Sequence, residues 1–471
     1  MSTDSRRANR VGVMRRRFAR TVAVVLGIFV VIGGAAAAVS VTQGPRITDV
    51  QADPASATSA SGSRVILTAN QSLDDVADDQ VTVDPETEFT VDAAGRTVGV
   101  RFPIALDAGT QYTVTVAGAR GIGGGPESDL TTTFTTPPAG VLALERDPEG
   151  DDRIVSRTIG GGEATTVFSA ANIDDYRATG AYLVASIVDG DTMRVIVVDR
   201  ASGEQVDVAL PGPGTVLGLQ VSERGQLYGF TFTDQDISAD SGRENVLFTG
   251  SLAGAFDGAE PDPVVVAGEE PSIDRWRFVP ETSSLLLNDF SGDLTLVDRT
   301  DPAGEVSSFG TALSIEGVAR STYTALIDRL EEGFVELDLA SGEQAAVSGV
   351  DLGGERLLGH MLPLADGGTL RSYALLEDGI PTTSDVVIVG TDGTAREVAT
   401  TAEGEALQQV CASPSVQYIA AAVSPIAGNP YGGEVQTLPQ DVETRIYDAD
   451  TGDLVETWPG FNISWCEVGP W

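Results

Sequence analysis

The stretch VIVVDRASGEQVDV, residues 195–208, decides the fold of this chain. It predicts two β-strands joined by a short turn, because apolar residues alternate or run together on both sides of a Ser-Gly pair. The pattern returns as LTLVDRTDPAGEVSSF from Leu294, FVELDLASGEQAAV from Phe334, VVIVGTDGTAREVA from Val386 and TRIYDADTGDLVETW from Thr444, and more loosely as RIVSRTIGGGEATTVF from Arg153 and VLFTGSLAGAFDGAEPDPVVV from Val246. Seven copies at a spacing of about 40–50 residues are typical of β-propeller blades.

Each repeat divides into four strands, A to D, of which C and D form the quoted hairpin. The first repeat has only three strands before Ala170, and one strand, Phe461–Val468, is left over at the C-terminus. We therefore predict an all-β fold with a seven-bladed β-propeller over residues 141–471, closed by the C-terminal strand as strand A of the first blade. Closure would bury the strand edges that an open array exposes. We expect the other A strands to begin near Ile173, Val216, Ile273, Leu313, Arg356 and Leu407.

The two cysteines fit this closure. Cys411 lies in strand A of the seventh repeat, and Cys466 lies in the closing strand. Because these strands would be neighbours, we predict a disulfide that joins the two ends of the ring. Two buried thiols are the alternative.

The composition is that of a globular protein with a strong acidic excess. Its formal net charge is −40, and without residues 1–20, which carry seven Arg and one Asp, it is −46. Such a field repels phosphate backbones, so nucleic acid is excluded as a partner. High solubility is the simplest consequence of the acidic surface.

The N-terminus predicts a membrane anchor. Residues 22–39 contain no charged side chain, and a cluster of Arg precedes them. About 20 apolar residues span a bilayer, and flanking Arg marks the cytoplasmic side. We predict a basic cytoplasmic tail over residues 1–20, a transmembrane helix over 21–41 and a location in the cell membrane, single-pass, with the C-terminal bulk extracytoplasmic. A cleaved signal peptide ending near residues 35–38 is the alternative.

Residues 45–136 predict a β-sandwich, because strands of five to eight alternating residues are separated by Gly, Asp and Pro. The order NQSL, VTVDP, LDAGTQYTVTVAGARGIGGGP and TTTFTTP resembles the SbsA-type bacterial Ig-like domain. The matching positions are Leu106, Tyr112, Val114, Val116 and a closing strand with Phe134. The resemblance implies a spacer or adhesion module without catalytic residues. A Pro-rich hinge, residues 137–140, follows it.

Taken together, the chain resembles an actinobacterial-type membrane-anchored envelope protein in which such a domain precedes a WD40/YVTN-like β-propeller. This resemblance concerns architecture and implies no particular ligand.

Candidate catalytic and metal-binding residues are few. His360 is the only histidine, so neither a zinc site nor a Ser-His-Asp triad has support beyond it. The acidic turns at 189–191 and 448–453 lack the spacing of a calcium loop and predict ordinary hairpins. No Gly-rich phosphate loop opens a helix. We predict no catalytic residue, no metal and no cofactor.

Loop lengths indicate one binding face. In a propeller, the B–C and D–A connections lie on one face and the A–B and C–D turns on the other. Three B–C loops are predicted to be long: Asp234–Arg243, Glu377–Ser384 and Ser424–Gln440. Long loops on a rigid scaffold are common binding sites. The candidate binding residues are Asp234, Asp236, Asp240, Arg243 and Tyr431; disordered decoration is the alternative.

Three functions remain open from the sequence. The first is a membrane-anchored binding or scaffolding protein of the cell envelope, whose partner is a protein or a cell-wall polysaccharide. The second is an exported enzyme that acts on cell-wall or capsular glycan, for which paired carboxylates should converge on the channel. The third is a sensor, although about 20 cytoplasmic residues leave no room for a signalling domain. All three are analogies at the level of the fold.

Overall fold

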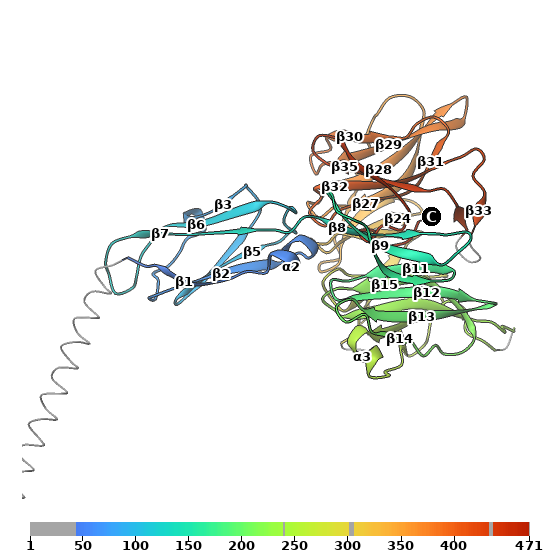
Figure 1. The fold of residues 1–471 in the computed structure, drawn as a ribbon, viewed down its shortest axis with the longest axis horizontal. Helices are drawn as coiled ribbons and strands as arrows, with labels where there is room; N and C mark the ends of the chain where they lie inside the picture. Colours follow the sequence, from blue (N-terminus) through green and yellow to red (C-terminus); the bar gives the residue numbers. More distant parts are fainter. Residues whose placement is uncertain (1–43, 239–240, 301–305, 433–436, 471) are drawn as a thin grey trace, which may run out of the picture. The chain divides into compact units, whose positions relative to one another are not determined.

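The computed structural model describes residues 44–238, 241–300, 306–432 and 437–470. Its contacts divide the chain into two compact units. The first comprises the described residues up to Asp53 together with 64–101 and 111–134, and the second comprises 54–63, 102–110 and the described residues from Thr135 onward. Both units are built from antiparallel β-strands (Figure 1).

The first unit contains two sheets. One has the order β1-β2-β5-β4 and the other the order β3-β6-β7. Alternation drives their formation, since every second residue is buried in β3 and, from Tyr112 to Val116, in β6. Tyr112 stacks on Phe134 with their ring centroids 5.7 Å apart. The strands are β1 (Ile47–Gln51), β2 (Ser63–Ala69), β3 (Val81–Asp84), β4 (Thr90–Ala94), β5 (Thr97–Phe102), β6 (Gln111–Ala119) and β7 (Ser128–Thr135).

In the described residues of the second unit, seven sheets of three or four strands follow one another along the chain. The first three consist of β8 (Gly140–Glu145), β9 (Asp152–Thr158) and β10 (Thr165–Ala170); β11 (Ile173–Ala178), β12 (Tyr182–Asp189), β13 (Thr192–Asp199) and β14 (Gln205–Asp207); and β15 (Gly214–Ser222), β16 (Leu227–Asp234), β17 (Val246–Ser251) and β18 (Asp262–Pro263).

The next four consist of β19 (Ile273–Phe278), β20 (Ser284–Asp289), β21 (Asp293–Asp298) and β22 (Ser307–Thr311); β23 (Ser314–Val318), β24 (Thr324–Arg329), β25 (Gly333–Asp338) and β26 (Gln344–Ala346); β27 (Arg356–Pro363), β28 (Thr369–Glu377), β29 (Ile380–Val389) and β30 (Ala395–Thr400); and β31 (Glu405–Ala412), β32 (Tyr418–Pro425), β35 (Glu443–Asp448) and β36 (Leu454–Pro459). A small extra pair, β33 (Tyr431–Gly432) and β34 (Leu438–Pro439), lies between β32 and β35.

Short helices complete the described structure. They are α2 (Pro54–Ser59), the 3-10 turn η1 (Asp78–Gln80) and α3 (Leu252–Phe256). Ser251 caps α3, because its side chain accepts a hydrogen bond from the Gly254 amide. The sequence analysis did not predict α3, which connects the last two strands of its sheet.

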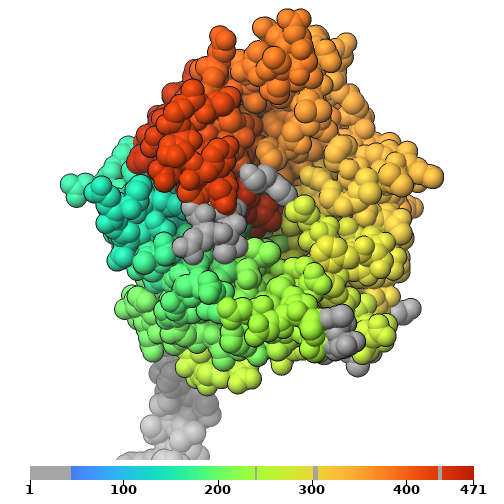
Figure 2. All heavy atoms as spheres, turned by 90° about the vertical axis from the view of Figure 1, so that its right-hand side faces the viewer, coloured from blue at the N-terminus to red at the C-terminus, as the bar shows by residue number. Residues whose placement is uncertain are grey.

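The seven sheets form a β-propeller. The first strands of neighbouring sheets contact one another, as β15 contacts β11 and β19, and β23 contacts β19 and β27. Figure 2 shows the sheets in a ring around a central hollow. Neighbouring sheets bury apolar side chains against each other; one cluster, for example, contains Val197 of β13 together with Phe230 of β16.

The two ends of the propeller meet. Leu144 of β8 and Phe461 exchange backbone hydrogen bonds of 2.8 and 3.0 Å, and the Leu142 amide donates to Ser464 Oγ at 3.0 Å. The C-terminal segment thus pairs with the free edge of the first three-stranded sheet. It does so through an isolated bridge followed by turns, so the prediction of a continuous strand over Phe461–Val468 is too long.

The structure contains the predicted disulfide between Cys411 of β31 and Cys466 of the C-terminal segment, with their Cα atoms 5.4 Å apart. Both cysteines belong to one apolar cluster that also includes Leu142 of the first sheet and Ile446 of the last. The covalent bond therefore joins the segment that closes the ring to its last sheet.

A repeated turn explains why the sequence pattern of residues 195–208 recurs along the chain. In VDRASG, the Asp199 carboxylate accepts hydrogen bonds from the Ala201 amide, the Ser202 amide and the Ser202 hydroxyl at 2.8–3.0 Å. Asp338 and Asp448 make the same three contacts in their own turns. The acidic turn at 448–453 is therefore an Asx-type hairpin turn, as predicted.

The predicted membrane localisation is corrected by the structure. Among the residues that the structure describes, no helix has the length and apolar character needed to cross a bilayer. Crossing takes about 20 apolar residues, whereas α2 and α3 have six and five residues. The predicted tail, residues 1–20, and the predicted helix, 21–41, lie outside the described residues.

Candidate functional site

The turns of the propeller separate into two faces. Because each sheet is an antiparallel meander, its second and third strands are joined at the end opposite to its other two turns. We call the face that carries these second-to-third-strand turns the B–C face. Figure 1 places β33, which lies in one such connection, at the right-hand edge, and Figure 2 looks onto that side.

Two of the predicted binding residues bind each other. Asp234 ends β16, and its carboxylate accepts hydrogen bonds from the amide and Nε of Arg243 at 2.7 and 3.0 Å. The Arg243 guanidinium also lies over the Phe232 ring, 5.7 Å from its centroid. This pair closes the base of the loop between β16 and β17. Their contacts are those of a loop clasp, and a binding role for either residue stays a prediction.

Of the other predicted binding residues, Asp236 and Tyr431 lie in different connections of the B–C face. Asp236 is exposed in the loop between β16 and β17, and Tyr431 is exposed in β33. Asp240 lies outside the described residues. The prediction of a long loop over Glu377–Ser384 is wrong, because β28 and β29 extend to Glu377 and Ile380 and leave only Asp378 and Gly379 between them. Both residues have positive φ, as a two-residue hairpin of type I′ requires.

Apolar side chains at the tips of the B–C turns are a further feature of this face, which was not predicted from the sequence. Five consecutive sheets of the described propeller each expose one or two large hydrophobic residues there: Ile237, Phe290, Leu330, Ile380, Ile426 and Tyr431. Phe290 is 62% exposed, Leu330 82% and Ile380 66%. On the opposite face, the comparable residues are Tyr323 in the turn between β23 and β24, and Leu454 and Val455 at the start of β36. An apolar residue between turn residues, as in DFSGD, was the sequence signal for this feature.

Carboxylates flank two of these apolar tips, Leu330 and Ile380. Glu331 and Glu332 follow Leu330, Glu377 and Asp378 precede Ile380, and all four are exposed. On this side, Arg356 forms a salt bridge with Asp385, in which the guanidinium nitrogen lies 2.9 Å from the carboxylate oxygen. The B–C face therefore combines projecting apolar side chains with acidic groups.

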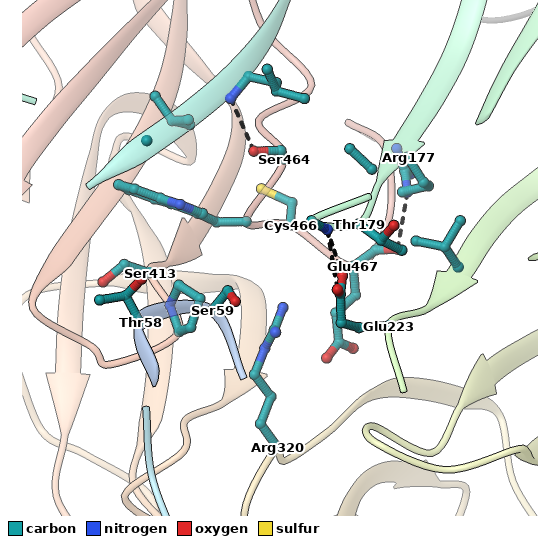
Figure 3. A pocket seen from close by; sticks show the side chains of 18 of the residues that line it. Thr58, Ser59, Arg177, Thr179, Glu223, Arg320, Ser413, Ser464, Cys466 and Glu467 are labelled. Carbon is teal, nitrogen blue, oxygen red and sulfur yellow. Dashed lines mark hydrogen bonds between the residues drawn. The ribbon is translucent and has the colours of Figure 1, made fainter. Parts of the chain in front are cut away.

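A cavity of about 290 Å³ opens among the A–B turns, on the side opposite to the B–C face (Figure 3). Its polar lining includes Arg177, Glu223, Arg320, Ser413, Ser464 and Glu467, together with Thr58 and Ser59 of α2. The Glu223 carboxylate accepts a hydrogen bond from the Gly180 amide at 2.8 Å, and the Glu281 carboxylate lies 2.9 Å from Arg224 Nε. Both carboxylates thus already have protein partners.

Burial perturbs the charged groups near this cavity. Desolvation raises the pKa of Glu467, although the nearby cations Arg320 and Arg277 oppose that shift. Desolvation also lowers the pKa of Arg277 to about 10. The opposite charges of Glu467 and Arg277 offset part of the desolvation cost of each group.

A buried polar network holds the C-terminal segment against the second sheet. Arg177 Nη1 donates to Asp175 Oδ1 at 2.7 Å and to Asn462 Oδ1 at 3.0 Å, and Asn462 Nδ2 donates to Asp175 Oδ1 at 2.6 Å. Arg177 Nε also donates to the Glu467 carbonyl at 3.1 Å. The polar groups of this network are hydrogen-bonded to one another within the protein. We therefore assign the network a structural role.

In the described part of the chain, no group of three or more His, Cys, Asp or Glu side chains is placed to hold a metal ion. His360 lies in β27, where its amide donates to Ser372 Oγ at 2.8 Å. Burial lowers the pKa of its imidazole.

No family model and no curated protein matches this sequence. Solved structures do match. A prolyl endopeptidase shares 14% identity with a TM-score of 0.50, over 69% of this chain and 50% of its own, so the chain spans about half of its length. The Cps50 (Swd1) β-propeller domain of Myceliophteria thermophila shares 13% identity, with a TM-score of 0.40 over 64% of this chain and 89% of its own. TolB of Acinetobacter baumannii shares 11%, with a TM-score of 0.37 over 83% and 81%.

At these identities, the endopeptidase match shows the fold alone, a β-propeller. The resemblance of residues 45–136 to the SbsA-type Ig-like domain stays a prediction, because no family model matches them.

Proposed function

We propose that this protein is a β-propeller binding platform that engages a protein or polysaccharide partner through its B–C face. In this proposal the propeller has seven blades, completed by the C-terminal segment, and the Ig-like region before it acts as a spacer. The acidic surface disfavours nucleic acid as the partner.

The exposed apolar tips are the observation that carries the proposal. An isolated exposed hydrophobic side chain is ordinary on a protein surface. Here such residues recur at the same turn of five consecutive sheets in the described propeller, with Phe290, Leu330 and Ile380 more than half exposed. Apolar groups that gather on one face and are rimmed by polar residues mark interaction sites. Burying them in a complex would recover about 25 cal/mol for each Å² removed from water.

A comparison of two triple variants tests the proposal. The tip variant carries Phe290→Ser, Leu330→Ser and Ile380→Ser on the B–C face. The opposite-face variant carries Tyr323→Ser, Leu454→Ser and Val455→Ser. Each protein is tagged, expressed in its own host and purified with its associated molecules, which are quantified by mass spectrometry and sugar analysis.

We expect the associated partner to be lost from the tip variant and kept by the opposite-face variant. All six positions are exposed, so both variants should fold, and their thermal unfolding midpoints check this. Loss of the partner from the opposite-face variant alone would contradict the proposal and direct attention to the A–B side and its cavity.

A further inference from the structure

We infer that the B–C face binds a cationic, amphipathic polypeptide segment of a partner protein. This inference rests on the proposed function and specifies the partner's chemistry. Aliphatic or aromatic side chains of the partner would pack against the apolar tips. Arg or Lys in the same segment would form ion pairs with the carboxylates beside the tips.

The acidic groups at the tips form no salt bridge with a basic side chain in the described residues. Among the described residues, Glu331, Glu332 and Asp378 take part in no salt bridge. The arginines on the same side are already engaged. Arg243 binds Asp234, and Arg329 donates to the carbonyls of Thr311 and Phe309. The face thus offers unpaired negative charge beside exposed apolar groups.

The carboxylates adjoin the apolar tips directly. Leu330 is followed at once by Glu331 and Glu332, and Ile380 is separated from Asp378 by one glycine. A partner side chain that covers Leu330 would therefore bring its neighbours within reach of two carboxylates. Electrostatic attraction of this kind accelerates association and discriminates against acidic partners.

The side chains at the tips favour a polypeptide over a glycan. Sugars are commonly held by flat aromatic rings, whereas most of the tips are aliphatic: Ile237, Leu330, Ile380 and Ile426. Aliphatic residues match the apolar face of an amphipathic helix or strand. An acidic glycan would also be repelled by the adjacent carboxylates.

A random library of peptides of about twelve residues, displayed on phage, tests this inference. The library is selected against the immobilised full chain, and the enriched peptides are then measured against three proteins. These are the tip variant, the opposite-face variant, and a charge variant with Glu331→Gln, Glu332→Gln and Asp378→Asn. A glycan array probed with the same proteins provides the parallel measurement.

We expect enriched peptides that combine Arg or Lys with large apolar residues. Their affinity should fall about tenfold or more for the tip variant, fall for the charge variant and with rising salt, and stay the same for the opposite-face variant. Enrichment of acidic or uncharged polar peptides would overturn the inference, as would equal binding to the tip variant.

The two levels of the proposal can fail separately. Binding of a glycan that is lost in the tip variant, without enrichment of basic peptides, would overturn the polypeptide inference and leave the binding face intact. Peptides or glycans that bind every variant equally would count against both.

Discussion

Arg177 is the residue on which the polar contacts of the inner strands converge. Its side chain is 5% exposed and binds Asp175, Asn462 and the Glu467 carbonyl. Asp175 and Arg177 come from β11, whereas Asn462 and Glu467 come from the end of the chain. A single guanidinium thus connects the C-terminal segment with the second sheet.

Replacing this guanidinium should be costly. In the variant Arg177→Met, the Asp175 carboxylate keeps the Asn462 amide but loses its cation in a buried site. We expect the free energy of unfolding to fall by about 3 kcal/mol, measured by urea denaturation with tryptophan fluorescence. Arg194→Met is the matched control, because Arg194 pairs with Asp207 while 48% exposed, and its loss should stay below about 1 kcal/mol. Similar small losses in both variants would contradict a structural role for the buried network.

His360 should make stability depend on pH in a defined direction. Burial lowers the pKa of its imidazole below the ordinary value of 6.5 in the folded state. As pH falls through 6.5, the unfolded chain binds a proton that the folded protein does not, so stability falls. The unfolding midpoint of the wild type should therefore drop more between pH 7.5 and 5.5 than that of His360→Gln. As His360 is the only histidine, its single imidazole NMR signal reports the pKa directly, and a value of 6.5 or above would refute the prediction.

The contacts of individual residues were the hardest feature to predict from the sequence. The Asp199 turn could be recognised because all its hydrogen bonds lie within three residues. The Arg177 network could not, since Asn462 is 285 residues away from Arg177. The exposed apolar residues of the B–C turns could not be predicted either, because one hydrophobic residue in a turn creates no periodicity.

At the scale of the elements, the repeated turn that begins with Asp and ends with Ser-Gly or Thr-Gly sets the register of the hairpins. Its glycine adopts a positive φ of 74° at Gly203, 76° at Gly342 and 73° at Gly452. This conformation is readily reached only by glycine. The turn thereby fixes which residues of β13 face those of β14.

A glycine substitution in this turn isolates the backbone contribution. A Cβ atom at Gly203 would meet no atom within 4 Å, so Gly203→Ala changes backbone strain without a clash. We expect a loss of about 1 kcal/mol in unfolding free energy. Gly349 also has open space but no positive φ, and Gly349→Ala should be neutral or slightly stabilising. If chemical denaturation shows equal effects for both, the turn does not constrain the hairpin as we describe.

The strands were largely predictable because their signals are local. All six predicted A strands begin within two residues of the observed starts of β11, β15, β19, β23, β27 and β31. The segment Glu377–Ser384 misled the analysis, because polar residues such as Thr382 and Thr383 are typical of loops. In the structure they continue the strands beyond the core, where polar side chains can stay partly exposed.

At the scale of the whole molecule, ring closure combines backbone pairing with a covalent bond. The disulfide joins residues 55 positions apart. The assignment of residues 54–63 and 102–110 to the second unit could not be predicted, because it depends on contacts between segments far apart in the sequence.

Removal of the disulfide should weaken the propeller. We expect the double variant Cys411→Ser, Cys466→Ser to lose about 2–5 kcal/mol, the usual effect of losing a native disulfide. Thermal unfolding with and without reductant checks this. Reductant should lower the midpoint of the wild type and leave the variant unchanged. Two free thiols in the mass of the native protein would show that the bond does not form.

The central claim is that partners bind the B–C face, and photo-cross-linking tests it most directly. A benzoylphenylalanine is placed at position 290 in one protein and at position 323 in another, and both are irradiated in the native host. We predict a discrete cross-linked partner from position 290, mapped to a basic segment, and none from position 323. A partner captured only from position 323, or equally from both, would contradict the claim.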